Sequence, residues 1–238
     1  MSGHEAHEHS HRDVTGGWLR PAVFGAMDGL VSNFALMAGI AGGTAALSQG
    51  RTAVVLAGLA GLAAGAFSMA AGEYTSVASQ AELAEQEFEN ERLELLRNPE
   101  AEARELAAIW IARGIDSDLA LQLAEQIGRN PEGALEVHAR EEFGMAPGEL
   151  PSPWLAAGSS FLSFVVGASI PVIPYLFGAQ DLIVSLILSV LGLFAAGVLV
   201  SRLTARSWWF SGLRQLFVGV LAAAVTFGIG TLVGHSLG

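Results

Sequence analysis

One carboxylate stands inside an apolar stretch near the start of the chain. The segment FGAMDGLVSNFALMAGIAGG, residues 24–43, contains a single charged side chain, Asp28. An ionised carboxylate inside a membrane span is costly, so Asp28 needs a partner, a cavity or a cation. The chain has no lysine, and no apolar stretch carries an arginine at a matching depth. Asp28 is therefore predicted to bind a cation or a proton. The alternative is a protonated or helix-capping aspartate in a tight bundle.

A methionine in the next apolar stretch is predicted to lie at the same depth as Asp28. At 1.5 Å per residue, Asp28 lies about 9 Å into its helix, and Met69 lies roughly seven residues before the end of a helix running the opposite way. Carboxylate oxygen suits Mn²⁺ and Fe²⁺, and a thioether disfavours Mg²⁺ and Ca²⁺. A transition-metal site is predicted, with Ser32 and Asn33 as further oxygen ligands and Glu73 at its entrance. Alternatively, Met69 is packing filler and Glu73 an interfacial charge.

A second group of potential ligands lies in an acidic segment, residues 76–152. Most of the 23 acidic residues of the chain lie between Glu73 and Glu149. Pairs three or four residues apart share one face of a helix; these pairs are Glu91 with Glu94, Glu102 with Glu105, and His138 with Glu142. Carboxylates and one imidazole could bind a divalent cation. The same pairs are also common on plain solvated helix faces.

Histidines are concentrated in the N-terminal tail, HEAHEHSHRD, at His4, His7, His9 and His11. A His-rich tract can collect metal ions, but a functionally silent tail fits the sequence equally well. The chain has no cysteine, which excludes disulfides, thiolate metal sites and cysteine nucleophiles.

The apolar stretches predict an all-α membrane protein with five transmembrane helices. A membrane-spanning helix needs about 20 mostly apolar residues. Five stretches qualify: 22–46, 53–75, 154–177, 181–201 and 213–235. Glycine is frequent in all five, which suits close packing of helices in lipid and would weaken helices of a soluble protein. Pro171 and Pro174 are predicted to kink or end the third span.

The acidic segment is predicted to be a helical insert between transmembrane helices 2 and 3. Its first helix continues from the second span without a breaker, Asn98-Pro99 and Asn130-Pro131 are typical of helix starts, and Asp116 can cap a further helix. The predicted organisation is a His-rich tail (1–20), transmembrane helices 1 and 2 (21–76), a helical metal-binding domain (77–152) and transmembrane helices 3 to 5 (153–238).

The arginines predict how the spans are oriented. Short loops rich in arginine remain in the cytoplasm. The tail, the insert and the loop between spans 4 and 5 carry all arginines except Arg51, which lies between spans 1 and 2. The N-terminus and the insert are therefore predicted to be cytoplasmic and the C-terminus outside, in a multi-pass protein of the cell membrane. Trp208 and Trp209 are expected at the cytoplasmic interface.

Two motifs resemble the vacuolar iron transporter family, in particular its bacterial members. They are DGLVSNFALMAGIAGG and AGAFSMAAGEYTSVASQ. The similarity continues through RNPEAEARELAAIWIARGID and HAREEFGM to GLRQLFVG, so it covers essentially the whole chain after the tail. The resemblance implies five transmembrane helices in a homodimer, a translocation path between the subunits, and exchange of cytosolic Fe²⁺ or Mn²⁺ against protons.

The resemblance also implies which residues bind the metal. Asp28 and Met69 would be the ligands in the membrane, and the ligands of the cytoplasmic domain would be Glu91, Glu94, Glu102, Glu105 and Glu142. Plant members carry paired methionines where this chain has His138 and Ala139, so the ligand set of the cytoplasmic site differs. Gly61 stands where plant members have a further acidic residue.

These observations predict a secondary transporter rather than an enzyme. Its predicted ions are Fe²⁺ or Mn²⁺ and protons, and no prosthetic group is expected. A membrane di-iron ferroxidase is one alternative, but such sites use Glu-x-x-His pairs, and the sequence has this pair only from Glu8 to His11. Another alternative is a metal sensor or docking protein that transports nothing, which would have no need of Asp28. Nucleic-acid binding is not expected, because the acidic insert would repel phosphates.

Overall fold

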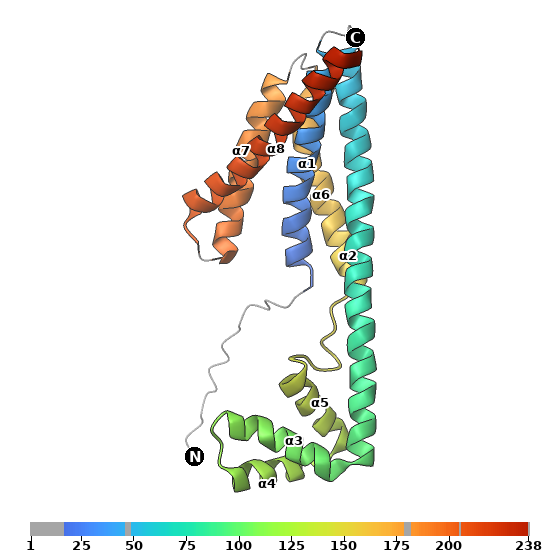
Figure 1. Ribbon diagram of the computed structural model, residues 1–238, viewed down its shortest axis with the longest axis vertical. Helices are drawn as coiled ribbons and strands as arrows, with labels where there is room; N and C mark the ends of the chain where they lie inside the picture. The colour runs from blue at the N-terminus through green and yellow to red at the C-terminus, as the bar shows by residue number, and fades with distance from the viewer. Residues whose placement is uncertain (1–16, 46–48, 179–181, 205, 238) are drawn as a thin grey trace, which may run out of the picture. The chain divides into compact units, whose positions relative to one another are not determined.

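The computed structural model describes residues 17–45, 49–178, 182–204 and 206–237, and these residues form helices without any strand. In chain order the helices are α1 (Leu19–Thr44), α2 (Gly50–Arg97), α3 (Pro99–Ala112), α4 (Ser117–Gly128), α5 (Pro131–Glu142), α6 (Pro153–Leu176), α7 (Ile183–Thr204) and α8 (Trp208–Leu237) (Figure 1). They form two compact units, which we call the apolar unit (described residues of 1–74 and 153–238) and the acidic unit (Thr75–Ser152).

The apolar unit contains five helices that are long and apolar enough to cross a membrane. They are α1, the first part of α2, α6, α7 and α8, so the five predicted apolar helices are confirmed. Their ends differ from the predicted ones by a few residues. The exception is α2, which continues into the acidic unit as the sequence predicted and is 48 residues long.

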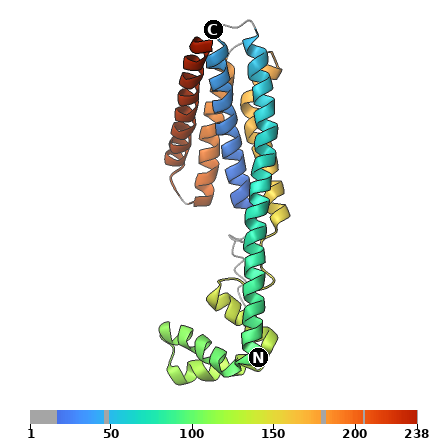
Figure 2. The ribbon, with the colours of Figure 1, turned by 45° about the vertical axis from the view of Figure 1, so that its right-hand side comes forward.

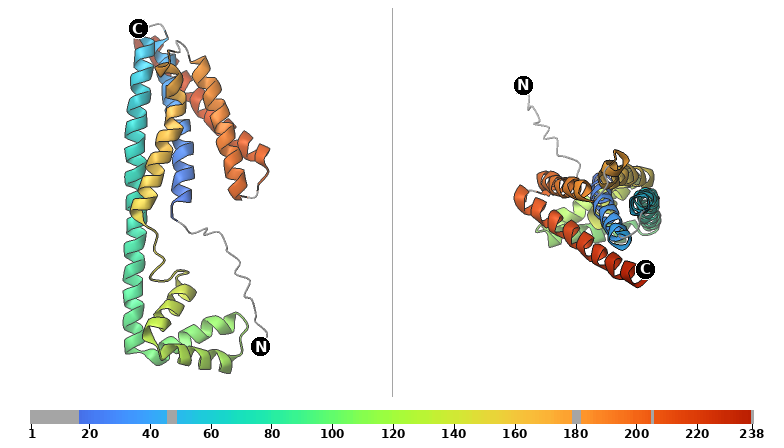
Figure 3. Two further views of the ribbon diagram at one scale, coloured as in Figure 1. Left: turned by 180° about the vertical axis from the view of Figure 1, so that it is seen from behind. Right: turned by 90° about the horizontal axis from the view of Figure 1, so that it is seen from above.

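Helix α1 lies at the centre of the apolar unit. It packs against α6, α7 and α8. Figure 2 shows α1 from the side among the apolar helices, and the view from above in Figure 3 shows it between its neighbours. Phe34 and Met37 of α1 are fully buried among them. The helix that carries Asp28 is therefore the one most surrounded by other helices, and this packing fixes where its polar side chains can point.

Glycines bring the backbones of α1 and α6 into contact. A Cβ atom on Gly29 would collide with the carbonyl oxygen of Phe164, and one on Gly167 would collide with that of Ala26. Small residues allow such close approach, which is how helices gain packing energy in lipid, where no hydrophobic effect drives them together.

We expect Gly167→Val to destabilise the protein, because the new side chain must force α6 away from α1. Overpacking of this kind costs about 1–3 kcal/mol. Gly158→Val is the matched control on the same helix, since a Cβ at Gly158 meets nothing within 4 Å. Thermal denaturation in detergent, followed by size-exclusion chromatography, should show a lower melting temperature for Gly167→Val alone. Equal melting temperatures would contradict the close contact.

Aromatic residues gather at one end of the apolar helices. Trp18 precedes α1, Tyr74 ends the apolar part of α2, Trp154 opens α6, and Trp208 and Trp209 open α8; all five are exposed. The helices run alternately up and down, so these positions share one end, and the rings of Tyr74 and Trp154 are in contact at 4.7 Å between centroids. Such a belt is typical of a membrane–water interface.

The two prolines of α6 lie in its last turns. The helix continues past Pro171 and ends at Leu176, two residues after Pro174, so its end lies close to the prolines, one of the two outcomes predicted for this segment. Ser185 of α7 donates a hydrogen bond of 2.7 Å to the carbonyl of Pro171. At the same end, Arg51 donates to the carbonyl of Tyr175 at 2.6 Å. Side chains of α7 and α2 thus donate to backbone carbonyls in the last turns of α6.

The acidic unit packs α3, α4 and α5 beside the last turns of α2. Its small core contains Leu106 and Trp110 of α3 with Ala120 and Ala124 of α4. Asp116 caps α4 by accepting from the backbone N–H groups of the two residues after Ser117, as predicted.

The two Asn-Pro pairs mark the starts of α3 and α5, as predicted. Pro99 and Pro131 begin these helices, but neither Asn98 nor Asn130 caps with its side chain. Instead, the amide of Asn98 donates to Glu94 at 3.1 Å.

Candidate metal sites

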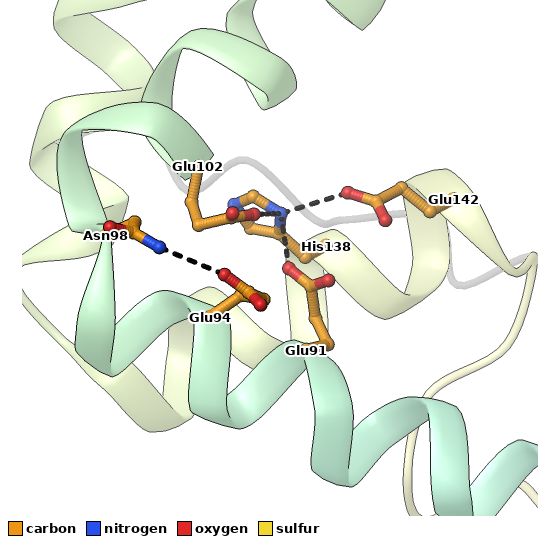
Figure 4. A network of polar contacts seen from close by, with 6 residues as sticks. All are labelled: Glu91, Glu94, Asn98, Glu102, His138 and Glu142. Carbon is orange, nitrogen blue, oxygen red and sulfur yellow. Dashed lines mark hydrogen bonds and ion pairs between the residues drawn. The ribbon is translucent and has the colours of Figure 1, made fainter.

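A buried histidine is the centre of a carboxylate cluster in the acidic unit. His138 of α5 is 2% exposed, and its Nδ1 atom lies 3.0 Å from Glu91, 3.1 Å from Glu142 and 3.9 Å from Glu102 (Figure 4). Glu91 comes from α2 and Glu102 from α3, so three helices contribute. The ligand atoms of Glu91, His138 and Glu142 lie within 4.8 Å of one another, which is close enough to hold one metal ion.

The carboxylates of this cluster repel one another. Burial, together with the charges of Glu142, Glu102 and Glu105, raises the pKa of Glu91 from 4.5 to about 8. Burial and the nearby Glu105 also raise the pKa of Glu102. Without a cation, the cluster therefore keeps a proton at neutral pH. A divalent cation would replace that proton and neutralise the remaining charges.

Hydrogen bonding leaves one of these carboxylates unsatisfied. Glu91 is 8% exposed, and its Oε1 atom accepts no well-aligned hydrogen bond, although it lies 3.0 Å from the imidazole nitrogen. One nitrogen cannot serve three carboxylates with a single N–H group. Carboxylate oxygens and an imidazole nitrogen without enough protons between them fit a divalent transition metal, which accepts both ligand types.

Contacts at the edge of the cluster hold α5 against α3. Trp110 Nε1 donates to Glu141 at 3.2 Å, and Arg113 forms an ion pair with the other oxygen of the same carboxylate. Glu141 precedes Glu142 in the chain, so both contacts set where Glu142 lies.

The two remaining predicted ligands of the acidic unit lie at the rim. Glu94 is exposed and accepts its hydrogen bond from Asn98. Glu105 is exposed too, although its charge acts on Glu91 and Glu102. The structure thus gathers Glu91, Glu102, His138 and Glu142 and leaves Glu94 and Glu105 outside this contact.

A second candidate site is a pocket of about 300 Å³ between α1, α2 and α6 in the apolar unit. It is lined by Asp28, Ser32, Asn33, Leu36, Gly61, Gly65, Ser68, Met69 and Phe164. Asp28 and Met69, from antiparallel helices, therefore share one pocket. Glu73, one turn beyond Met69, is partly buried and does not line it.

Sequence reasoning missed two features of this pocket. Ser68 lines it, yet no spacing rule distinguishes this serine from others in the span. Gly65 also lines it, and a Cβ there would collide with the ring of Phe164. The aromatic ring forms one wall of the pocket because α2 has a glycine at that point.

The comparison with known proteins decides the family. The sequence profile described as the VIT family matches residues 19–231. The chain belongs to the VIT family. This VIT-family chain is 35% identical over 223 residues to a protein of Acanthamoeba castellanii named vacuolar iron transporter, covering 92% of this chain and 79% of that protein. It is 32% identical over 239 residues to vacuolar iron transporter 1 of rice, Oryza sativa, covering 98% and 92% respectively.

A third relative, vacuolar iron transporter 1 of Arabidopsis thaliana, is 32% identical over 234 residues, covering 95% of this chain and 91% of that protein. All three relatives are named as transporters, not as enzymes. The matched residues of the VIT-family chain include both the pocket of the apolar unit and the cluster of the acidic unit. The four tail histidines lie outside the described residues.

The metal-free VIT-family protein should lose stability in its acidic unit as pH rises. The pKa of Glu91 is about 8 when folded and 4.5 when unfolded. The contribution of protonated Glu91 to the free energy of unfolding is therefore fully present below about pH 4.5 and is lost as pH rises towards 8. Hydrogen exchange of α3 and α5, measured in the full-length protein with chelator and corrected for intrinsic rates, should be at least about tenfold faster at pH 8 than at pH 6.

Two variants check the origin of this pH dependence. Glu91→Gln should flatten the profile, because the neutral amide resembles the protonated acid. Glu94→Gln, an exposed position on the same helix, should leave the profile unchanged. An equally steep profile in Glu91→Gln would show that another group is responsible.

Proposed function

We propose that this chain transports Fe²⁺, and Mn²⁺ as a second substrate, across a membrane through the pocket that contains Asp28 and Met69. The observation that carries the proposal is this pair of side chains in one pocket among five apolar helices. A carboxylate and a thioether together suit a divalent transition metal better than Mg²⁺ or Ca²⁺. The names of the relatives support iron as the transported ion.

Proton antiport follows from the chemistry of Asp28. The carboxylate must be deprotonated to bind a metal ion, so a proton and the metal compete for the same oxygen atoms. A pocket that exchanges one ion for the other couples their movements in opposite directions. With a proton gradient directed inward, metal leaves the cytosol.

The cluster of the acidic unit is proposed to collect metal from the cytosol. Glu91, His138 and Glu142 would be its ligands, with Glu102 beside them, and the rim residues Glu94 and Glu105 would add negative charge that attracts cations. The imidazole distinguishes this set from an all-carboxylate site and favours Fe²⁺ over Mg²⁺ or Ca²⁺. Glu73 would lie on the route into the pocket.

The arginines and the aromatic belt support one orientation. Arg20, Arg202 and Arg214 lie at the end of the apolar helices that also carries Trp154 and Trp208, so this end would face the cytoplasm. The N-terminus and the acidic unit would then be cytoplasmic, the C-terminus outside, and the protein a multi-pass exporter of the cell membrane.

The pocket also supports a homodimer. Asp28 is half-buried, and Ser32 and Ser68 are exposed within the single chain. Polar groups at this depth cannot face hydrocarbon without cost. A second copy of the chain would cover them and leave the transport path between the two subunits.

Asp28→Asn should abolish transport. The amide keeps the size of the side chain but removes the charge that binds the metal and exchanges the proton. Purified protein in liposomes, with Fe²⁺ or Mn²⁺ on one side and an imposed pH gradient, should show metal flux with opposite proton flux in the wild type and none above empty liposomes in the variant. Glu85→Gln, an exposed carboxylate of α2, is the matched control and should transport normally. Full transport by Asp28→Asn would refute the model.

Glu91→Gln combined with Glu142→Gln should weaken metal binding by the acidic unit at least about tenfold, because two charged ligands are lost. Calorimetry with Mn²⁺ on full-length protein in the Asp28→Asn background isolates this site. Glu125→Gln with Glu132→Gln, both exposed, serves as the control. Unchanged affinity would place the site elsewhere. Metal binding here without any flux in the wild type would instead favour a non-transporting sensor.

A further inference from the structure

One polar side chain in the pocket lacks a hydrogen-bonding partner. Asn33 of α1 is 2% exposed, and its Oδ1 atom is buried without accepting any hydrogen bond. Buried amide oxygens are normally paired, so an orphaned one requires an explanation. The residue lines the same pocket as Asp28 and Met69.

The other half of the Asn33 amide is firmly placed. Its Nδ2 atom donates a hydrogen bond of 2.8 Å to the backbone carbonyl of Ala168 on α6. A carbonyl accepts only from the NH₂ group, so this bond decides which way the amide is turned. The oxygen must then point away from α6.

The oxygen points towards α2 at a position where that helix has no side chain. A Cβ atom on Gly61 would lie 2.6 Å from Asn33 Oδ1, inside van der Waals contact. Gly61 lines the pocket as well. The glycine thus leaves room for the buried amide oxygen against the backbone of α2, in the wall of the pocket.

A neighbouring hydroxyl shows the contrast. Ser32 also lines the pocket, but it donates to the carbonyl of Asp28 in its own helix at 2.6 Å. Its polar hydrogen is therefore already used. Among the described residues that line the pocket, Asn33 is the one with a buried side-chain oxygen that accepts no hydrogen bond.

We propose that Asn33 Oδ1 is a third ligand of the transported divalent metal, beside Asp28 and Met69, and that Gly61 is required to admit it. This inference rests on the proposed transport function. An amide oxygen adds a ligand without adding charge. The metal is therefore held by more atoms while its binding stays weak enough for release, as transport requires. A hard oxygen next to the thioether also lets the pocket accept Mn²⁺ as well as Fe²⁺.

Two substitutions of Asn33 separate a ligand from a structural residue. Asn33→Leu removes the oxygen and the donor; Asn33→Asp keeps an oxygen but also loses the donor to Ala168. In the liposome assay, Asn33→Leu should raise KM for Mn²⁺ at least about tenfold, whereas Asn33→Asp should retain transport. If both variants are impaired equally, the residue is structural and the inference is wrong. If both behave as the wild type, it is wrong as well.

A third variant tests the oxygen without touching Asn33. Gly61→Ala leaves the donor in place but forces Oδ1, together with the end of the Leu36 side chain, out of position, so KM should rise as in Asn33→Leu. Gly72→Ala is the matched control on the same helix, because a Cβ there meets nothing within 4 Å. A normal KM for Gly61→Ala would overturn the role given to the glycine.

Binding of Co²⁺ gives a readout that does not depend on flux. In a Glu91→Gln and Glu142→Gln background, the visible absorption of Co²⁺ reports the pocket, and Asn33→Leu should weaken this binding and change the band intensity. An unchanged Co²⁺ titration would overturn the inference. The transport proposal fails separately, if the wild type shows no flux or if Asp28→Asn transports normally.

Discussion

The free-energy cost of placing carboxylates away from water governs both candidate sites. An ionised carboxylate that leaves water must find protons, hydrogen-bond donors or a cation. In the acidic unit, Glu91, Glu102 and Glu142 converge on one imidazole, and no arginine among the residues that the structure describes forms an ion pair with them. In the apolar unit, Asp28 lies on the most enclosed helix and forms no ion pair with any of the described residues. Both arrangements are incomplete until a cation or a proton arrives.

The two sites meet this cost by different means. The cluster can store a proton on Glu91, whose pKa lies near 8, and this proton reduces the repulsion between the carboxylates when no metal is bound. The pocket is instead partly open, so that Asp28 is only half-buried. In the cluster, a metal ion must displace the stored proton, which suits a site that collects metal. The partly open pocket suits an ion that must both enter and leave. The chemistry of each site thus matches the step that we propose for it.

Small residues make this architecture possible. Gly29 and Gly167 bring α1 and α6 into backbone contact, and that contact places Ala168 within reach of Asn33. Gly61 and Gly65 leave space on α2 that the Asn33 amide and the Phe164 ring occupy. The glycines therefore do more than tighten the bundle, because they decide which polar atoms face the pocket.

The sequence alone determined the helical class, the five apolar helices and the continuous α2, because hydrophobic length and the absence of helix breakers are local properties. It also placed Asp28 and Met69 at one depth, since the rise of a helix is constant. Only the tertiary structure decided which glutamates converge on His138, that Glu94 and Glu105 stay at the rim, and that Asn98 bonds to Glu94 instead of capping α3. It also decided that Asn33 presents an unpaired oxygen opposite Gly61. Spacing along one helix cannot reveal these contacts, because each depends on how a second helix is packed and rotated against the first.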